Sequence, residues 1–335
     1  MKLRHHLILA PFATAGIALV IVLTLVFWPE SETQTLDNYD YSALEGIEDT
    51  NFSANQNWLR LRDGLELFYR LYPSSDSNTI LILVHGSGTE SRHLEKIANQ
   101  LSSEGLMTVV TPDMRGHGES AEVEGDISYI GQYDDDVEDL IEHFKQIYPA
   151  SKILLGGHSS GGGLVLRYAG NASASKADGY IWLAPYLGHD APTTKPNSGD
   201  WVTVNVKRWV GLSILNGFGV KRLNGLPVLR FNRPEEWNDP LQVSHYSYRL
   251  ATSFATSNYS RDVAKIDRPG LVLVGSDDES FYPEAYSLAF ASAEEKVDVE
   301  ILPQISHIGI TRSDAVMKKI THWYAKTYTL ESRAN

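Results

Sequence analysis

Short apolar segments that alternate with helical patterns constrain the fold of this chain more than any other feature of its sequence. Each segment has the length of a β-strand, and most successive pairs are separated by enough residues for a helix. Strands spaced in this way form a parallel sheet whose two faces are covered by helices, so the pattern predicts an α/β fold. The expected strands are 58–62, 65–72, 80–84, 107–111, 152–155, 180–183, 271–274 and 297–302.

Local signals add a hairpin at the start of this domain and helices farther along it. Asp63-Gly64 lies between the first two strands and is typical of a tight hairpin turn, so these strands should be antiparallel. The clearest helix is expected between residues 128 and 148, where apolar side chains recur at helical spacing. Ser313 can cap a last helix that closes the domain.

The alternation stops between about residues 187 and 240, where five prolines and six glycines leave no clean period. We expect a cap insertion here rather than another strand and helix. From Trp201 to Arg233 it contains six basic residues and no acidic one, although the whole chain has a net charge of −13. Two interpretations stay open: a cap with its charges in water, or a surface that meets an apolar substrate tail or an anionic lipid.

Composition and missing motifs exclude several classes of function. The chain has no cysteine, which rules out disulfides, thiolate metal sites and a cysteine nucleophile. Its negative charge argues against a nucleic-acid partner, which would need distributed positive charge. The motifs of zinc peptidases, nucleoside triphosphatases and dinucleotide-binding enzymes do not occur. We therefore expect no cofactor and no metal.

The N-terminal region predicts a membrane anchor. Residues 7–28 contain 22 residues without a charge, which is long enough to span a bilayer and longer than the usual apolar core of a cleaved signal peptide. Lys2 and Arg4 precede this run and acidic residues follow it, so the positive-inside rule places the N-terminus in the cytoplasm. Residues 29–56 read as a flexible linker, and 57–330 as the globular domain on the extracytoplasmic (periplasmic or extracellular) side.

A serine motif indicates the chemistry. Gly157-His158-Ser159-Ser160-Gly161 fits the pattern Gly-x-Ser-x-Gly and lies between an expected strand and a helical pattern, the context in which such a serine is a nucleophile. A serine hydroxyl needs a base, and the base needs a carboxylate to orient it. Asp277, Asp278 and His307 follow later strands at the edge where α/β folds place their sites. Ser159 and His307 are therefore the expected nucleophile and base.

Together these residues resemble the α/β-hydrolases of the monoacylglycerol lipase or lysophospholipase-like group over residues 58–328. His85-Gly86-Ser87-Gly88 and the segment 112–120 also match that family. The resemblance implies the α/β-hydrolase fold, Asp278 as the acid, and an oxyanion hole formed by the backbone N–H groups of Ser87 and Ser160. Asp277 stays open as the acid, because spacing alone does not decide which carboxylate faces His307. His85, His117 and His158 are expected to be structural.

The sequence thus predicts a membrane-anchored serine hydrolase that cleaves carboxylic esters through an acyl-enzyme on Ser159. Its expected partners are the bilayer, through residues 7–28, and a lipid-like monoester such as a monoacylglycerol or a lysophospholipid. Two alternatives remain: a serine peptidase or amidase on the same fold, and an anchored binding domain without activity. Oligomeric state and acyl-chain length leave no signal in the sequence.

Overall fold

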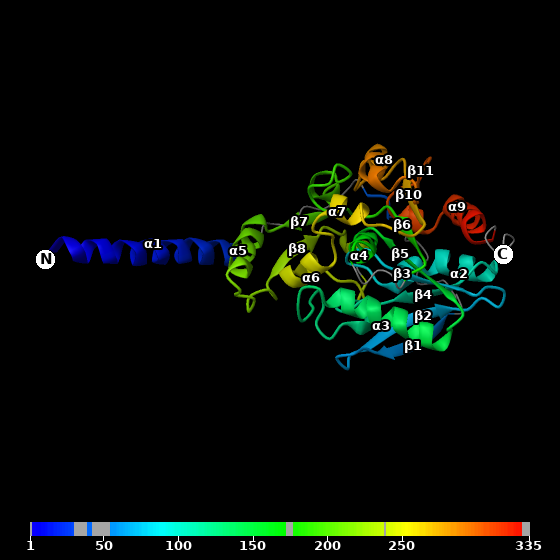
Figure 1. The fold of residues 1–335 in the computed structure, drawn as a ribbon, viewed down its shortest axis with the longest axis horizontal. Coiled ribbons are helices and arrows are strands. Elements are labelled where there is room, and N and C mark those ends of the chain that lie inside the picture. Colours follow the sequence, from blue (N-terminus) through cyan, green and yellow to red (C-terminus); the bar gives the residue numbers. More distant parts are fainter. Residues whose placement is uncertain (1, 30–38, 42–53, 172–176, 238, 330–335) are drawn as a thin grey trace.

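A computed structural model describes residues 2–29, 39–41, 54–171, 177–237 and 239–329 of the chain (Figure 1). Side chains are described from residue 14 to residue 328 of these ranges, except at position 236. The globular domain is built around an eight-stranded sheet in which the strands have the order β1-β2-β4-β3-β5-β6-β10-β11. Its strands are β1 (Asn55–Arg60), β2 (Glu66–Tyr72), β3 (Thr79–Val84), β4 (Thr108–Pro112), β5 (Lys152–His158), β6 (Gly179–Leu183), β10 (Gly270–Gly275) and β11 (Val297–Leu302).

The sheet is mostly parallel, which confirms the predicted α/β architecture. The pairs β1–β2 and β2–β4 are antiparallel, and the remaining neighbours are parallel. Every residue of β3, β6 and β10 is buried, as expected for strands covered on both faces. The hairpin predicted at Asp63-Gly64 joins β1 to β2, and Gly64 adopts the positive φ of 92° that such a turn requires.

Helices cover both faces because the strand order reverses direction after β4. Right-handed crossovers place α2 on one face and put α3 and α4 on the other. Contacts agree with this arrangement, since α2 packs against α9 whereas α4 packs against α3 and α7. The helices are α2 (Glu95–Ser103), α3 (Gln132–Ile147), α4 (Ser160–Ala169), α7 (Tyr259–Val263), α8 (Tyr286–Ala289) and α9 (Asp314–Tyr324).

The expected cap insertion forms a small sheet of its own. It consists of antiparallel strands β7 (Val202–Val204), β8 (Pro227–Phe231) and β9 (His245–Ser247), with helix α5 (Val206–Gly217) between the first two and α6 (Tyr248–Ser253) after the third. This unit runs past the predicted end near residue 240. The sequence does not reveal its strands, because runs of three to five residues are too short to show a period.

Helix α1 (Lys2–Val26) projects away from the sheet and meets the cap at its C-terminal end (Figure 1). The Arg208 side chain on α5 donates to the carbonyl oxygens of Val26, at 3.1 Å, and Trp28, at 2.9 Å. Gly211 gives α1 room, because a Cβ there would lie 2.8 Å from the Val26 nitrogen. Among the helices that the structure describes, none has the length and hydropathy needed to cross a membrane.

Most of the predicted linker, residues 30–38 and 42–53, lies outside the described residues. Residues 39–41, within the same span, pack against the globular domain. Tyr39 and Tyr41 are 8% and 6% exposed and form an aromatic cluster with Trp201 of the cap. The Asp40 N–H donates to the Glu279 carboxylate at 2.9 Å. This part of the predicted linker is therefore packed into the surface of the globular domain.

Candidate active site

Ser159 occupies a sharp turn between β5 and α4. Its φ of 53° and ψ of −119° lie in a region that residues with a side chain rarely adopt, so the surrounding structure must hold this strained conformation. Glycines make the turn possible. A Cβ at Gly157 would lie 2.4 Å from the Gly161 carbonyl carbon, and one at Gly161 would lie 2.4 Å from the His85 oxygen. The serine hydroxyl is thereby held clear of the backbone.

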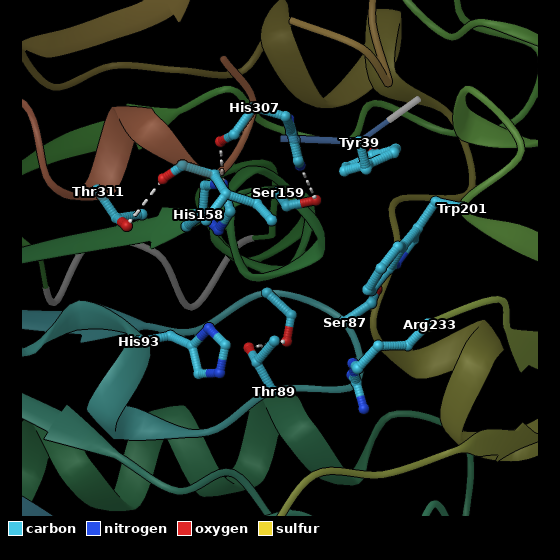
Figure 2. Close-up of a pocket in the computed structure, with 12 residues that line it drawn as sticks. Tyr39, Ser87, Thr89, His93, His158, Ser159, Trp201, Arg233, His307 and Thr311 are labelled. Atoms are coloured by element: carbon cyan, nitrogen blue, oxygen red, sulfur yellow. Dashed lines mark hydrogen bonds between the residues drawn. The ribbon is translucent and has the colours of Figure 1, made fainter. Parts of the chain in front are cut away.

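A continuous hydrogen-bonded relay joins Ser159, His307 and Asp278. His307 Nε2 lies 3.0 Å from Ser159 Oγ, and His307 Nδ1 lies 2.8 Å from Asp278 Oδ2 (Figure 2 shows the serine and histidine). Since the carboxylate accepts from Nδ1–H, Nε2 is free to accept the serine proton. Both the histidine and the aspartate are buried.

The structure places Asp278, rather than Asp277, at the histidine. Asp278 Oδ1 accepts hydrogen bonds from the backbone N–H groups of Ser280 and Phe281, at 2.9 and 2.8 Å, which fixes the carboxylate that faces His307. Asp277 is exposed and accepts instead from the Ser276 hydroxyl at 2.7 Å. The two adjacent carboxylates therefore have different environments, although they look equivalent in sequence.

His307 is also held through its backbone. Its N–H donates to Glu279 Oε2 at 2.7 Å, and its carbonyl accepts from His158 Nε2–H at 3.0 Å. Burial and the nearby His307 lower the pKa of His158 to about 3, so His158 is neutral at ordinary pH. The ring of Phe281 packs edge-on against His307 with centroids 5.0 Å apart. These contacts leave the imidazole one orientation between acid and nucleophile.

The loop 85–88 lies beside the nucleophile, as the predicted oxyanion hole requires. Ser87 Oγ donates to Ser160 Oγ at 2.8 Å, which brings the two residues together, and neither backbone N–H has an acceptor among the described residues. Gly88 N–H donates to the Tyr246 hydroxyl at 2.7 Å, and that hydroxyl donates to His117 Nε2 at 2.6 Å. A cap residue therefore sets the position of this loop.

The comparisons with known proteins identify the family. Residues 75–310 match the sequence profile of Hydrolase_4, described as serine aminopeptidase, S33. The chain belongs to this family. A solved structure of a soluble variant of monoglyceride lipase from Saccharomyces cerevisiae shares the α/β-hydrolase fold, with a TM-score of 0.61 and 18% identity over 86% of this chain and 98% of that one.

Two curated relatives of this S33-family chain match over shorter stretches. Human monoglyceride lipase is 29% identical over 129 residues, which are 37% of this chain and 41% of the relative. Proline iminopeptidase from Saccharolobus solfataricus is 36% identical over 107 residues, which are 32% of this chain and 33% of the relative. The chain thus spans less than half the length of each of these relatives.

Around the relay, this S33-family protein forms a pocket that is partly open to solvent. Figure 2 shows side chains from three separate regions around it: Tyr39 from the predicted linker, Trp201 and Arg233 from the cap, and His93 from the core domain. Sequence reasoning did not assign these residues to the site. The aromatic and basic composition of the cap is a signal for Trp201 and Arg233. Nothing in the sequence around Tyr39 indicates that this residue reaches the site. Within the described residues no cluster of side chains is suited to a metal ion.

Proposed function

We propose that this protein is a serine esterase that cleaves carboxylic esters of lipid-like substrates through an acyl-enzyme on Ser159. The observation that carries the proposal is the relay Ser159–His307–Asp278, with both hydrogen bonds in place at 3.0 and 2.8 Å. Serine hydrolases need this arrangement to deprotonate an alcohol that is inert at neutral pH. The likeness to human monoglyceride lipase supports an ester with an acyl chain as the substrate.

The reaction has two steps. Ser159 Oγ attacks the ester carbonyl while His307 Nε2 accepts its proton, and Asp278 stabilises the imidazolium. The Ser87 and Ser160 N–H groups donate to the oxyanion, where each such donor typically contributes about 10²- to 10³-fold in kcat. The imidazolium then protonates the departing alcohol. Water, deprotonated by His307, attacks the acyl-enzyme, and the acid leaves as Ser159 recovers its proton.

The second candidate is an aminopeptidase, which the family description and the likeness to a proline iminopeptidase favour. An aminopeptidase has to bind the ammonium group of its substrate, and a buried carboxylate is the usual partner for such a cation. No carboxylate lines the described part of the pocket, where Arg233 supplies a positive charge instead. The electrostatics of the pocket thus support the esterase over the aminopeptidase.

We also propose that residues 7–28 anchor the protein, with a cytoplasmic N-terminus and the catalytic domain on the extracytoplasmic side. The uncharged run of 22 residues and the basic residues before it support this topology. Exposed side chains on α1, such as Ile17 at 62% and Val20 at 63%, suit a lipid environment. An anchored protein stays in the membrane fraction after alkaline carbonate extraction, and protease added to sealed cells or spheroplasts removes the catalytic domain. Release by carbonate contradicts the anchor.

Labelling with a fluorophosphonate tests the catalytic claim. We expect the wild-type protein to be labelled and Ser159→Ala to lose the label. Ser103→Ala is the matched control, because it removes an exposed serine hydroxyl on helix α2 that donates to the Gln100 carbonyl, and this variant should keep the label. Hydrolysis of p-nitrophenyl esters of increasing chain length, compared with aminoacyl anilides, then separates the two enzyme classes. Absence of labelling in the wild type contradicts the proposal, and faster cleavage of the anilides reassigns the protein to the aminopeptidases.

A further inference from the structure

The pocket above Ser159 contains one permanently charged side chain among its described lining residues, and that side chain is Arg233. It follows strand β8 of the cap and lies beside Trp201, on the side of the pocket formed by Ser87 and Thr89 (Figure 2). The other lining residues are neutral or are histidines, in a protein whose net charge is −13. The pocket therefore contains a positive charge, although the chain as a whole is strongly negative.

The contacts of Arg233 leave most of its hydrogen-bonding capacity unused. Its Nη2 donates to the Gly88 carbonyl at 2.9 Å, and the guanidinium lies over the Trp201 ring, 5.6 Å from the centroid. A guanidinium has five N–H donors in a planar fork that suits carboxylate and phosphate oxygens. Among the described residues, no carboxylate lies within 4 Å of this fork.

The carboxylate whose charge acts on Arg233 is already paired with another arginine. The charge of Asp239 acts on Arg233, but its carboxylate forms an ion pair with Arg92 at 2.7 Å. Burial lowers the pKa of Arg233, which is the effect expected when a cation loses water without gaining a close anion. Desolvating a charge without a partner is unfavourable, so the free fork is best satisfied by an anion that arrives with a ligand.

We propose that Arg233 binds an anionic group, a carboxylate or a phosphate, on the ester substrate. This inference rests on the proposed esterase function and narrows its substrate class. Because Gly88 directly follows Ser87 of the proposed oxyanion hole, the anion lies within a few bonds of the scissile carbonyl, on its acyl or its alcohol part. An acidic monoester then fits the pocket better than a neutral monoacylglycerol.

Matched ester pairs test this specificity on the full chain. The first pair is the 4-nitrophenyl monoester of adipic acid and its neutral adipamate counterpart, which place the charge on the acyl side. The second pair is the butyrate esters of 3-hydroxybenzoate and 3-hydroxybenzamide, and the third is 1-butyrylglycerol 3-phosphate and 1-butyrylglycerol. These two pairs place a carboxylate or a phosphate on the alcohol side. Rates are normalised to the number of sites titrated by a fluorophosphonate.

Removing the charge should lower the rate for anionic esters more than the rate for neutral ones. In Arg233→Gln we expect kcat/KM for the anionic member of at least one pair to fall about tenfold or more relative to its neutral partner, as for loss of a charge-assisted hydrogen bond. Arg233→Lys should retain part of the preference, because it keeps the charge without the fork. Arg222→Gln, which removes an exposed charge from the same cap, should leave every ratio unchanged.

Each outcome assigns or overturns the inference. Loss of preference in the carboxylate pairs alone identifies a carboxylate ligand, and loss in the glycerophosphate pair alone identifies a phosphate. An equal fall for both members of every pair makes Arg233 only a structural link to Gly88 and overturns the inference. The inference is also overturned if the ratio of kcat/KM between the anionic and the neutral ester of each pair is the same in the wild type and in Arg233→Gln. A wild type that neither labels nor hydrolyses any ester refutes the esterase itself, which is a distinguishable result.

Discussion

At the scale of single residues, the adjacent carboxylates Asp277 and Asp278 provide a sharp test of the relay. They are one position apart, but only Asp278 contacts His307, at 2.8 Å, whereas Asp277 is exposed and bonded to Ser276. In Asp278→Asn, the amide no longer fixes the imidazole tautomer, and kcat should fall about 10³- to 10⁴-fold. Asp277→Asn should stay within about twofold of wild type. Steady-state hydrolysis of p-nitrophenyl butyrate measures both, and the opposite ranking would reassign the acid.

We expect Tyr246 to be a positioning residue that acts through the loop 85–88 of the proposed oxyanion hole. Its hydroxyl accepts from Gly88 N–H, so Tyr246→Phe leaves a buried donor without an acceptor, which typically costs about 1–3 kcal/mol unless the loop shifts. A shift moves the neighbouring Ser87 N–H, and we expect kcat per titrated site to fall about tenfold with KM nearly unchanged.

A matched tyrosine separates this effect from a general loss of packing. Tyr248 is also buried in the cap, and its hydroxyl lies 3.1 Å from Ser213 Oγ rather than near the loop. Tyr248→Phe should therefore keep the wild-type kcat. If Tyr246→Phe lowers the melting temperature but keeps kcat per titrated site, the tyrosine stabilises the cap without positioning the oxyanion hole.

At the scale of elements, local patterns predict the sheet well, and tertiary contacts explain what they miss. Strand β11 has the predicted bounds because its apolar run ends at clear turn signals. Strand β5 instead extends to His158, since pairing with β3 and β6 continues through Gly156 and Gly157, which have no β propensity of their own. Spacing to the nearest strand predicted where His307 and the two aspartates lie. It did not predict Tyr39 or Arg233, which reach the pocket only through the packing of linker and cap.

The junction between α1 and α5 fixes how the N-terminal helix meets the cap, and a substitution at Gly211 tests it. A Cβ at Gly211 would lie 2.8 Å from the Val26 nitrogen, so Gly211→Ala should displace the end of α1 from α5. The natural chain has no cysteine, so Val26→Cys places a single thiol probe at a fully buried position. We expect this thiol to be protected from a maleimide in the parent chain and to react with it when Gly211→Ala is added.

The matched control places the same methyl group elsewhere on α5. A Cβ at Gly217 would have no neighbour within 4 Å, so the Val26→Cys thiol should stay protected from maleimide in Gly217→Ala. Equal maleimide reactivity in the two alanine variants would mean that α1 is not seated at Gly211. Hydrolysis of a soluble ester by the Gly211→Ala protein then shows whether the junction matters for turnover.

At the scale of the whole molecule, buried neutral histidines make the folded state sensitive to acid. Burial lowers the pKa values of His85, His93 and His117, and it lowers that of His158 to about 3. The unfolded chain takes up these protons near the ordinary histidine pKa of about 6.5, whereas the folded chain does not. Their contribution to stability is complete above that pH and is lost as the pH falls toward 3. Glu90 has the opposite effect on how stability depends on pH, because burial and the nearby Asp113 raise the pKa of its carboxyl group to about 7.

Comparing His158→Gln with the wild type separates the contribution of His158 to the pH dependence of stability from the opposing contribution of Glu90, which both proteins share. For His158, lowering the pH from 7 to 5 should reduce the free energy of unfolding by about 2 kcal/mol, since the unfolded state gains the proton over that interval. His158→Gln keeps a donor for the His307 carbonyl but has no titrating group, so its stability should fall less by about that amount. Urea unfolding of the full chain in a nonionic detergent, followed by tryptophan fluorescence at both pH values, measures the difference. If the free energy of unfolding falls by the same amount in both proteins between pH 7 and 5, His158 is protonated in the folded state.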